Sequence, residues 1–371
     1  MMEFTTDVSS FATALEQIQS AVDKKNTIPI LTHCMVEAEP QGLRLSATDL
    51  ELGIRLSCAA QVKEASSIAV PARRLLDIAQ SLGEGELRVQ ETENHWVRIT
   101  AGRSRFKLAA MAKDNFPAMP VVPRSLGSVS AVTLGGLIDR TAFAISQQEG
   151  RYTLNAALMV LKHDSILMVA TDGSRLPLVG HDAEVSGLKN EVRLLIPRRA
   201  LAALGRLADT QEGDTPVQIA KDDSHLFFTV GDAVLISRMI SGQFPNYEAA
   251  LPQSNGITAT ADTAAFRKAL ERVSLLASDQ HHGVSLALDA GRITLSSAAG
   301  ETGEAMESLD AEYSQEPIRL GFNSQFLLDF FKVVRNGNIV MTLKDVQSAV
   351  EFRPADSQGY RYRYVVMPMR M

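Results

Sequence analysis

Val169-Ala-Thr-Asp-Gly-Ser-Arg-Leu-Pro177 is a β-rich apolar run that stops at an Asp-Gly turn and is followed by an arginine in a Leu-Pro frame. Asp-Gly between apolar segments favours a turn, because glycine accepts positive φ and aspartate bonds nearby backbone amides. The same pattern stands in Leu45-Ser-Ala-Thr-Asp-Leu-Glu-Leu52 and, degraded, in Leu295-Ser-Ser-Ala-Ala-Gly-Glu301. The interval is about 125 residues, the size of an ordinary domain. The sequence therefore predicts an internal repeat.

Each repeat begins with an amphipathic segment, at 9–24, 132–146 and 262–277, whose apolar residues fall on one helical face. Asp262 is the expected N-cap of the third. A second helix is expected after Val70-Pro71, Ile196-Pro197 and Leu320-Gly321, with proline at the first helical position of the first two. Alternating strands follow at 86–99, 225–237 and 339–352.

These repeats predict an α+β fold of three domains, each with two helices packed on antiparallel sheets. Connectors rich in proline, glycine and serine divide the chain into domains 1–128, 129–255 and 256–371. Phe116-Pro and Phe244-Pro recur at the ends of the first two repeats. Three unrelated α+β domains remain the alternative.

The composition, with 45% hydrophobic and 22% charged residues, is typical of a globular protein. The chain shows no apolar run of membrane-span length and no signal peptide. Its two cysteines, Cys34 and Cys58, are too few for a disulfide framework. We therefore expect a cytoplasmic protein that does not engage a membrane.

The sequence lacks a phosphate-binding glycine loop, a zinc-type His/Cys pattern and a nucleophile elbow. Asp172 and Ser174 have no histidine near them in the sequence, although His163 and His181 could approach in space. We therefore expect no catalytic residue, no metal and no cofactor. A nucleic-acid-modifying enzyme on a repeated scaffold stays an alternative.

The net charge of −6 argues against a generally basic DNA-binding domain but allows a basic stripe. Basic residues recur on or beside the expected helices. A domain of about 125 residues has a radius of gyration near 14 Å. Six such domains in a ring leave a hole of roughly 25–35 Å, and a DNA duplex of about 20 Å passes through it. A head-to-tail dimer could therefore encircle DNA.

The whole chain resembles the bacterial DNA polymerase III beta subunit family, the sliding clamps. The resemblance is carried by Val70-Pro-Ala-Arg73, Ala170-Thr-Asp-Gly-Ser-Arg-Leu176, Phe244-Pro-Asn-Tyr247 and Val365-Val-Met-Pro-Met-Arg370. It implies a ring-shaped homodimer that encircles double-stranded DNA without sequence preference. It also implies a non-catalytic processivity factor, placed by an ATP-dependent clamp loader, that tethers the replicative DNA polymerase and other proteins carrying clamp-binding peptides.

The resemblance further implies a partner-peptide pocket between the second and third domains, in which an apolar trough receives leucine or phenylalanine anchors. This chain departs from relatives at Ser174, Glu248, Ala249 and Phe326, which bears on partner selectivity. The implied pocket residues are Leu154, Thr171, Gly173, Ser174, Arg175, Leu176, Pro245, Asn323, Phe326, Val365, Val366, Met367, Pro368, Met369 and Arg370.

Two further residue sets follow from the same resemblance. The implied DNA contacts are Lys25, Arg73, Gln148, Arg151, Arg198 and Arg199. The implied dimer interface sets Ile78, Leu82, Phe106 and Leu108 of one chain against Leu275 and Leu276 of the other. A peptide-binding repeat scaffold that never meets DNA is the remaining alternative.

Overall fold

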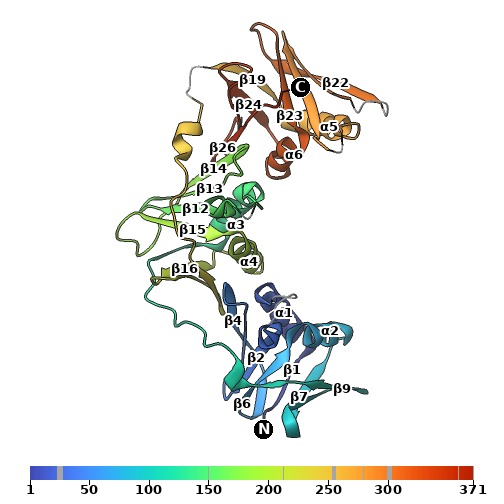
Figure 1. Ribbon diagram of the computed structural model, residues 1–371, viewed down its shortest axis with the longest axis vertical. Coiled ribbons are helices and arrows are strands. Elements are labelled where there is room, and N and C mark those ends of the chain that lie inside the picture. The colour runs from blue at the N-terminus through green and yellow to red at the C-terminus, as the bar shows by residue number, and fades with distance from the viewer. Residues whose placement is uncertain are drawn as a thin grey trace. The chain divides into compact units, whose positions relative to one another are not determined.

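The computed structural model describes residues 1–22, 28–148, 150–211, 213–252, 256–278, 280–298, 303–357 and 359–370 (Figure 1). The chain forms two compact units. Unit 1 consists of Met1–Gly135, Ser186–Lys189 and Arg199–Met239, and unit 2 of Gly136–Val185, Asn190–Arg198 and Ile240–Met371. The middle of the chain is thus divided between the two units.

Unit 1 contains two antiparallel sheets. The five-stranded sheet has the order β5 (Gln61–Glu64), β1 (Glu3–Asp7), β7 (Glu86–Thr92), β8 (Trp96–Ala101) and β9 (Ser104–Ala109). The nine-stranded sheet has the order β10 (Met111–Ala112), β6 (Ser66–Pro71), β2 (His33–Glu39), β3 (Gly42–Thr48), β4 (Leu52–Cys58), β18 (Ala233–Arg238), β17 (His225–Val230), β16 (Pro216–Lys221) and β11 (Gly127–Ser130).

Unit 2 is built on one twelve-stranded sheet. Its order is β15 (Val192–Pro197), β12 (Ala156–Leu161), β13 (Ser165–Val169), β14 (Arg175–Asp182), β26 (Tyr360–Val366), β25 (Val350–Pro354), β24 (Asn338–Leu343), β19 (Ile257–Asp262), β22 (Glu304–Glu312), β21 (Arg292–Ala298), β20 (Gly283–Asp289) and β23 (Ile318–Asn323). The pairing of β14 with β26 joins strands from the second and third repeats.

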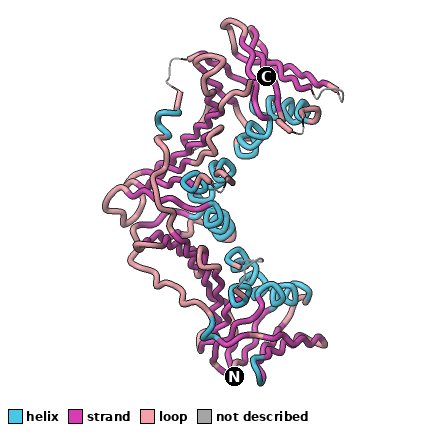
Figure 2. Tube along the Cα trace, viewed as in Figure 1, coloured by secondary structure: helices cyan, strands magenta, loops and turns pink. Residues whose placement is uncertain are grey.

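The described residues contain two α-helices per repeat. They are α1 (Val8–Ile18) with α2 (Ala72–Ser81), α3 (Ala131–Thr141) with α4 (Arg198–Asp209), and α5 (Thr263–Ser274) with α6 (Ser324–Val333). α1 packs on α2 and α5 on α6, and Figure 2 shows both pairs as neighbouring cyan helices beside magenta strands. The predicted α+β fold, with two helices per repeat and antiparallel sheets, is confirmed.

The predicted helix starts were correct in one detail and wrong in another. Asp262 caps α5, because its carboxylate accepts a hydrogen bond of 2.7 Å from the Ala265 amide. Pro71 and Pro197, however, close β6 and β15, and the helices begin one residue later. Each proline is the last residue of a strand and directly precedes the helix, where its fixed φ and missing amide hydrogen are tolerated.

An aromatic cluster fixes the C-terminal strand against α6. The Phe330 ring stacks on Tyr364 with centroids 5.5 Å apart and on Tyr362 at 5.4 Å. The Tyr364 hydroxyl donates a 2.7 Å hydrogen bond to the Phe326 carbonyl. Since Phe330 and Tyr364 are fully buried, β26 has a fixed position beside β14.

Candidate functional site

The turn between β13 and β14 is held by its own side chains. Thr171 Oγ1 accepts from the Gly173 amide at 3.0 Å and donates to the Arg175 carbonyl at 2.7 Å. Asp172 Oδ1 accepts from the amides of Ser174 and Arg175, at 2.9 and 3.1 Å. Gly173 has φ +94°, a conformation that glycine adopts without strain. The turn predicted from Asp-Gly is therefore confirmed.

Arg175 joins this turn to α6. Its Nε donates to Asp172 Oδ2 at 3.0 Å, its Nη1 to Asp329 Oδ2 at 2.6 Å and its Nη2 to the Phe143 carbonyl at 2.8 Å. The guanidinium also lies 4.3 Å from the Phe326 ring centroid. Its side chain is 10% exposed. Burial by itself lowers the pKa of Arg175, but Tyr364 and the two carboxylates raise it overall, so the charge is permanent.

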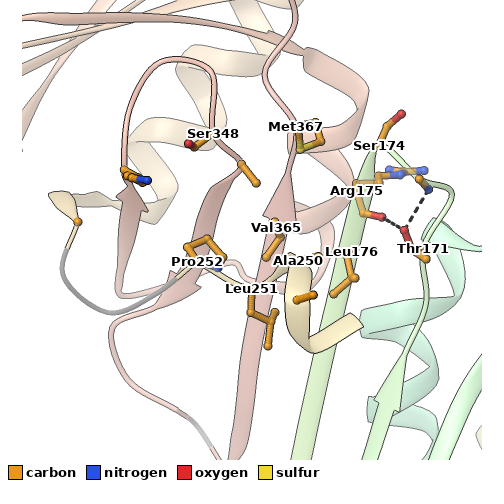
Figure 3. A pocket seen from close by; sticks show the side chains of 15 residues that line it. Thr171, Ser174, Arg175, Leu176, Ala250, Leu251, Pro252, Ser348, Val365 and Met367 are labelled. Atoms are coloured by element: carbon orange, nitrogen blue, oxygen red, sulfur yellow. Dashed lines mark hydrogen bonds between the residues drawn. The ribbon is translucent and has the colours of Figure 1, made fainter. Parts of the chain in front are cut away.

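β14 continues from the turn and pairs with β26, which sets Leu176 opposite Val365. Beside this pair lies a pocket of about 640 Å³ (Figure 3). Leu176 and Val365 belong to one buried apolar cluster, and Leu251 and Ala349 pack against it. The lining consists of Thr171, Gly173, Ser174, Arg175, Leu176, Ala249, Ala250, Leu251, Pro252, Gly256, Lys344, Ser348, Ala349, Val365 and Met367.

The structure brings seven of the expected pocket residues to this lining and places the others around it. Pro245 lines a separate cavity of about 560 Å³ with Phe244 and Tyr247. Asn323 caps α6 by accepting from the Gln325 amide, and Phe326 supports Arg175. Val366 is fully buried, and the Met369 amide bonds to the Gly321 carbonyl. Leu154, Pro368 and Arg370 line neither cavity.

Sequence reasoning missed part of the lining. Residues Ala249 to Pro252 form one wall, and Lys344, Ser348 and Ala349 reach the pocket from the turn after β24. The Phe244-Pro245 signature stands only a few residues before Ala249, so it was the one sequence feature that pointed toward this wall. The turn after β24 carries no recognisable motif. Its residues line the pocket because of the order of the strands in the sheet, which the sequence does not reveal.

The residues expected to contact DNA differ in how far their charges are already paired. Lys25 lies outside the described residues. Arg73 pairs with Asp77 on α2 at 2.9 Å. Arg151 Nη1 donates to the Asp172 carbonyl at 3.3 Å, and Arg198 lies beside the Gln147 amide. Arg199 Nη1 lies 2.6 Å from Asp49 Oδ2, and Gln148 is exposed.

The residues expected at the dimer interface lie on or near two strands with an open side. β9, which carries Phe106 and Leu108, ends the five-stranded sheet, and Ile78 and Leu82 are half-buried on and just after α2. On its β19 side, among the described residues, β22 pairs only through Ala311 and Glu312. Leu275, 81% exposed, and Leu276 follow α5, which packs against β22. Both strands have unpaired backbone groups to offer.

Over the described part of the chain, no group of three or more His, Cys, Asp or Glu side chains is arranged to hold a metal ion. The same residues include no helix of the length and apolarity needed to span a membrane. Cys34 and Cys58 are both unpaired, and burial raises the pKa of the Cys34 thiol to about 12.

Three family models match consecutive stretches of the chain. They describe the DNA polymerase III beta subunit: the N-terminal domain matches residues 2–120, the central domain 128–246 and the C-terminal domain 248–370. The chain belongs to this family. The resemblance inferred from the Asp-Gly turn, the Phe-Pro signatures and the C-terminal strand is thus confirmed.

Full-length relatives support the same assignment. The chain is 32% identical to the beta sliding clamp of Pseudomonas aeruginosa over 372 residues and 34% identical to that of Caulobacter vibrioides over 380 residues, covering 100% of each. The crystal structure of the DNA polymerase III subunit beta from Pseudomonas aeruginosa matches with a TM-score of 0.90 at 32% identity, over 100% of both chains.

Arg175 offers a first prediction, on stability. Arg175→Met removes the cation that Asp172 and Asp329 share, so among the described residues Asp172 loses its ion pair and Asp329 keeps only Lys332. We expect the free energy of unfolding to fall by about 3 kcal/mol. Urea denaturation followed by circular dichroism measures this loss. The control is Arg238→Met, whose ion pair with Glu51 is exposed on both sides, with an expected cost below about 1 kcal/mol. Equal losses in the two variants would contradict the role given to Arg175.

Proposed function

We propose that this chain works as a DNA sliding clamp, a non-catalytic processivity factor of a DNA polymerase. The observation that carries the proposal is the match of all three beta-subunit domain models, in order, over nearly the whole chain. Relatives named beta sliding clamp are covered along their entire length. No catalytic chemistry is required of such a factor, because its role is to hold another protein on DNA.

We further propose three domains, bounded at 1–128, 129–255 and 256–371, and a head-to-tail homodimer that closes six of them into a ring around double-stranded DNA. A ring holds its template by topology, so it needs only weak, water-spaced attraction to phosphates and can slide. An acidic chain with cations on a few helices suits this arrangement, since strong nonspecific binding would slow movement. DNA replication takes place in the bacterial cytoplasm, which is the proposed location.

For the dimer interface we propose that β9 of one copy pairs with β22 of the other. The exposed side chains of β9 include Arg105 and Lys107, whereas those of β22 include Glu304, Asp310 and Glu312. Opposite charges on two open edges favour pairing between them and discourage pairing of like edges. Phe106 and Leu108, with Leu275 and Leu276 from the other copy, would supply the apolar contact.

For the DNA contacts we propose Arg73, Gln148, Arg151 and Arg198, with Lys25. The ion pairs of Arg73 and Arg199 differ in their cost of breaking. Asp77 is 42% exposed, so Arg73 can leave it for a phosphate at little cost. The Asp49 side chain is 4% exposed, so Arg199 would leave a buried carboxylate unpaired. Arg199 is therefore proposed to reach phosphate while keeping its hold on Asp49.

For partner proteins we propose capture of a short peptide in the pocket beside Leu176 and Val365. The pocket combines an apolar floor with polar groups at Thr171, Ser174 and Ser348. Such a site buries an apolar anchor and orients the peptide backbone. Met367, 46% exposed, adds an adaptable side chain that can contact anchors of different shape. The proposed users are the replicative polymerase, the ATP-dependent clamp loader and other proteins that carry such a peptide.

Topological retention tests the function itself. The labelled chain, placed with a clamp loader and ATP on a nicked circular plasmid, should remain bound during gel filtration in high salt. Cutting the plasmid once should release it, because a ring slides off a free end. Equal retention on the circle and on the linear product would rule out a sliding clamp and favour ordinary DNA binding.

Charge reversal tests the dimer interface. Arg105→Glu with Lys107→Glu should raise the dissociation constant of the dimer at least tenfold at low salt, because like charges would then face each other. Sedimentation velocity measures the change. Adding Glu304→Lys and Asp310→Lys to the same chain should restore the dimer. The control is Arg98→Glu, on the neighbouring strand β8, which should leave the dimer unchanged.

Leu176→Ala tests the pocket. We expect it to weaken binding of a peptide with a Leu-Phe pair by about 30-fold, because a central apolar contact is lost, and removal of residues 367–371 should have a similar effect. Calorimetry gives the affinity, and sedimentation should still show a dimer. Leu178→Ala is the control for lost stability, since Leu178 shares the cluster but does not line the pocket. Unchanged affinity in Leu176→Ala would contradict the pocket.

A further inference from the structure

The turn that builds the pocket occurs a second time, inside unit 1, at Thr48 and Asp49. Thr48 Oγ1 accepts from the Leu50 amide at 3.0 Å and donates to the Leu52 carbonyl at 3.1 Å. Asp49 Oδ1 accepts from the amides of Glu51 and Leu52, at 3.0 and 2.7 Å. These four hydrogen bonds match, donor for donor, those made by Thr171 and Asp172.

The backbone path is also the same. Leu50 has φ +76° at the place where Gly173 has φ +94°. This conformation strains a leucine, because its Cβ clashes with the backbone, whereas glycine adopts it without strain. Leu50 nevertheless adopts it although the residue is 51% exposed, so burial of the leucine does not offset the strain. The side-chain hydrogen bonds of Thr48 and Asp49 impose the turn.

The strands beyond the two turns make equivalent pairs. β4 pairs with β18 and sets Gly53 opposite Ile236, as β14 pairs with β26 and sets Leu176 opposite Val365. A connector segment lines the groove at each place: Pro117 to Pro120 at the first and Ala249 to Pro252 at the second. The cavity at the first is about 230 Å³, against about 640 Å³ at the second.

Met119, in the connector, accounts for the smaller cavity. A Cβ atom on Gly53 would lie 2.8 Å from Met119 Cε, so the methionine occupies the space directly above the strand. Met119 packs against a buried cluster formed by Ala220, Phe227 and Ile236. An unbranched, flexible thioether fills such an irregular groove well. The chain thus places an apolar side chain of its own where the second groove is open.

We propose that the groove above Gly53 is a second copy of the peptide pocket, kept closed by Met119 of the chain's own connector. Its occupant, a segment with Pro117 and Pro120 on either side of one apolar anchor, points to a short peptide as the ligand class. The same class of peptide would enter once the Met119 side chain is removed, while the intact chain offers one open pocket. The identity of the ligand class rests on the peptide pocket proposed above.

Covalent attachment explains why the groove stays closed. A tethered side chain is present at a high effective concentration, typically millimolar, whatever the concentration of a competing peptide. Pro117 and Pro120 restrict the backbone on both sides of the anchor, so little conformational entropy is lost when Met119 enters. A free peptide has neither advantage: it must be recruited from solution, and its backbone loses more conformational entropy on binding.

The test counts peptides per chain by calorimetry, with a synthetic peptide that carries a Leu-Phe pair. The intact chain should bind one, Leu176→Glu none, and Leu176→Glu with Met119→Gly one again, at least tenfold tighter than Leu176→Glu alone. Leu176→Glu with Met119→Leu is the matched control, because leucine refills the groove and should keep binding absent. Thermal unfolding of each variant shows whether it is folded.

The outcomes separate the two proposals. A folded Leu176→Glu, Met119→Gly variant that binds no peptide overturns the closed second pocket and leaves the open one intact. Undiminished binding by Leu176→Glu alone overturns the open pocket instead, and the second is then judged by whether Met119→Gly adds one further peptide per chain. If that double variant does not fold, Met119→Ala replaces it, with the same expected gain and the same refutation.

Discussion

The ion pairs of Arg175 are the interaction on which the candidate site depends. One guanidinium reaches Asp172 in the turn, Asp329 on α6 and the Phe143 carbonyl. Because the planar group donates in several directions at once, it fixes the turn, the helix and the preceding segment relative to one another. Without this contact, Leu176 and Val365 would still pair, but the polar edge of the pocket would have no fixed position. The stability of this region and the geometry of the pocket therefore depend on one residue.

An ion pair links a turn to a helix at two places in the chain, with the charges exchanged. Around β14 the strand supplies the arginine and the helix supplies Asp329, whereas around β4 the turn supplies Asp49 and the helix supplies Arg199. In each case a charge in or directly after the turn meets its opposite on a helix. Each of the two turns is therefore tied to a helix by an ion pair, although the residues that form it stand at different positions. Duplicated sites can then diverge, with one groove open and the other filled.

Exposed charges of opposite sign are also segregated on two other strands, β9 and β22. The chain is acidic overall, yet β9 exposes Arg105 and Lys107 and β22 exposes Glu304, Asp310 and Glu312. An acidic chain repels nonspecific contacts with nucleic acid, so attraction is limited to the places where cations gather. A protein that must slide on DNA gains from this arrangement, because no single contact holds it in place.

Periodicity, turn chemistry and the repeated Phe-Pro signatures determined much of this protein from the sequence alone: the two helices of each repeat, the antiparallel strands and the turn at Thr171 and Asp172. These features are local, so neighbouring residues suffice to specify them. Only the tertiary structure decided which distant residues meet. Lys344 and Ser348 reach the pocket because the turn that carries them joins β24 to β25, and β25 pairs with β26. Met119 reaches Gly53 because its connector segment lines the same groove as β4. Strand order and register set such contacts, and no periodicity along the chain records them.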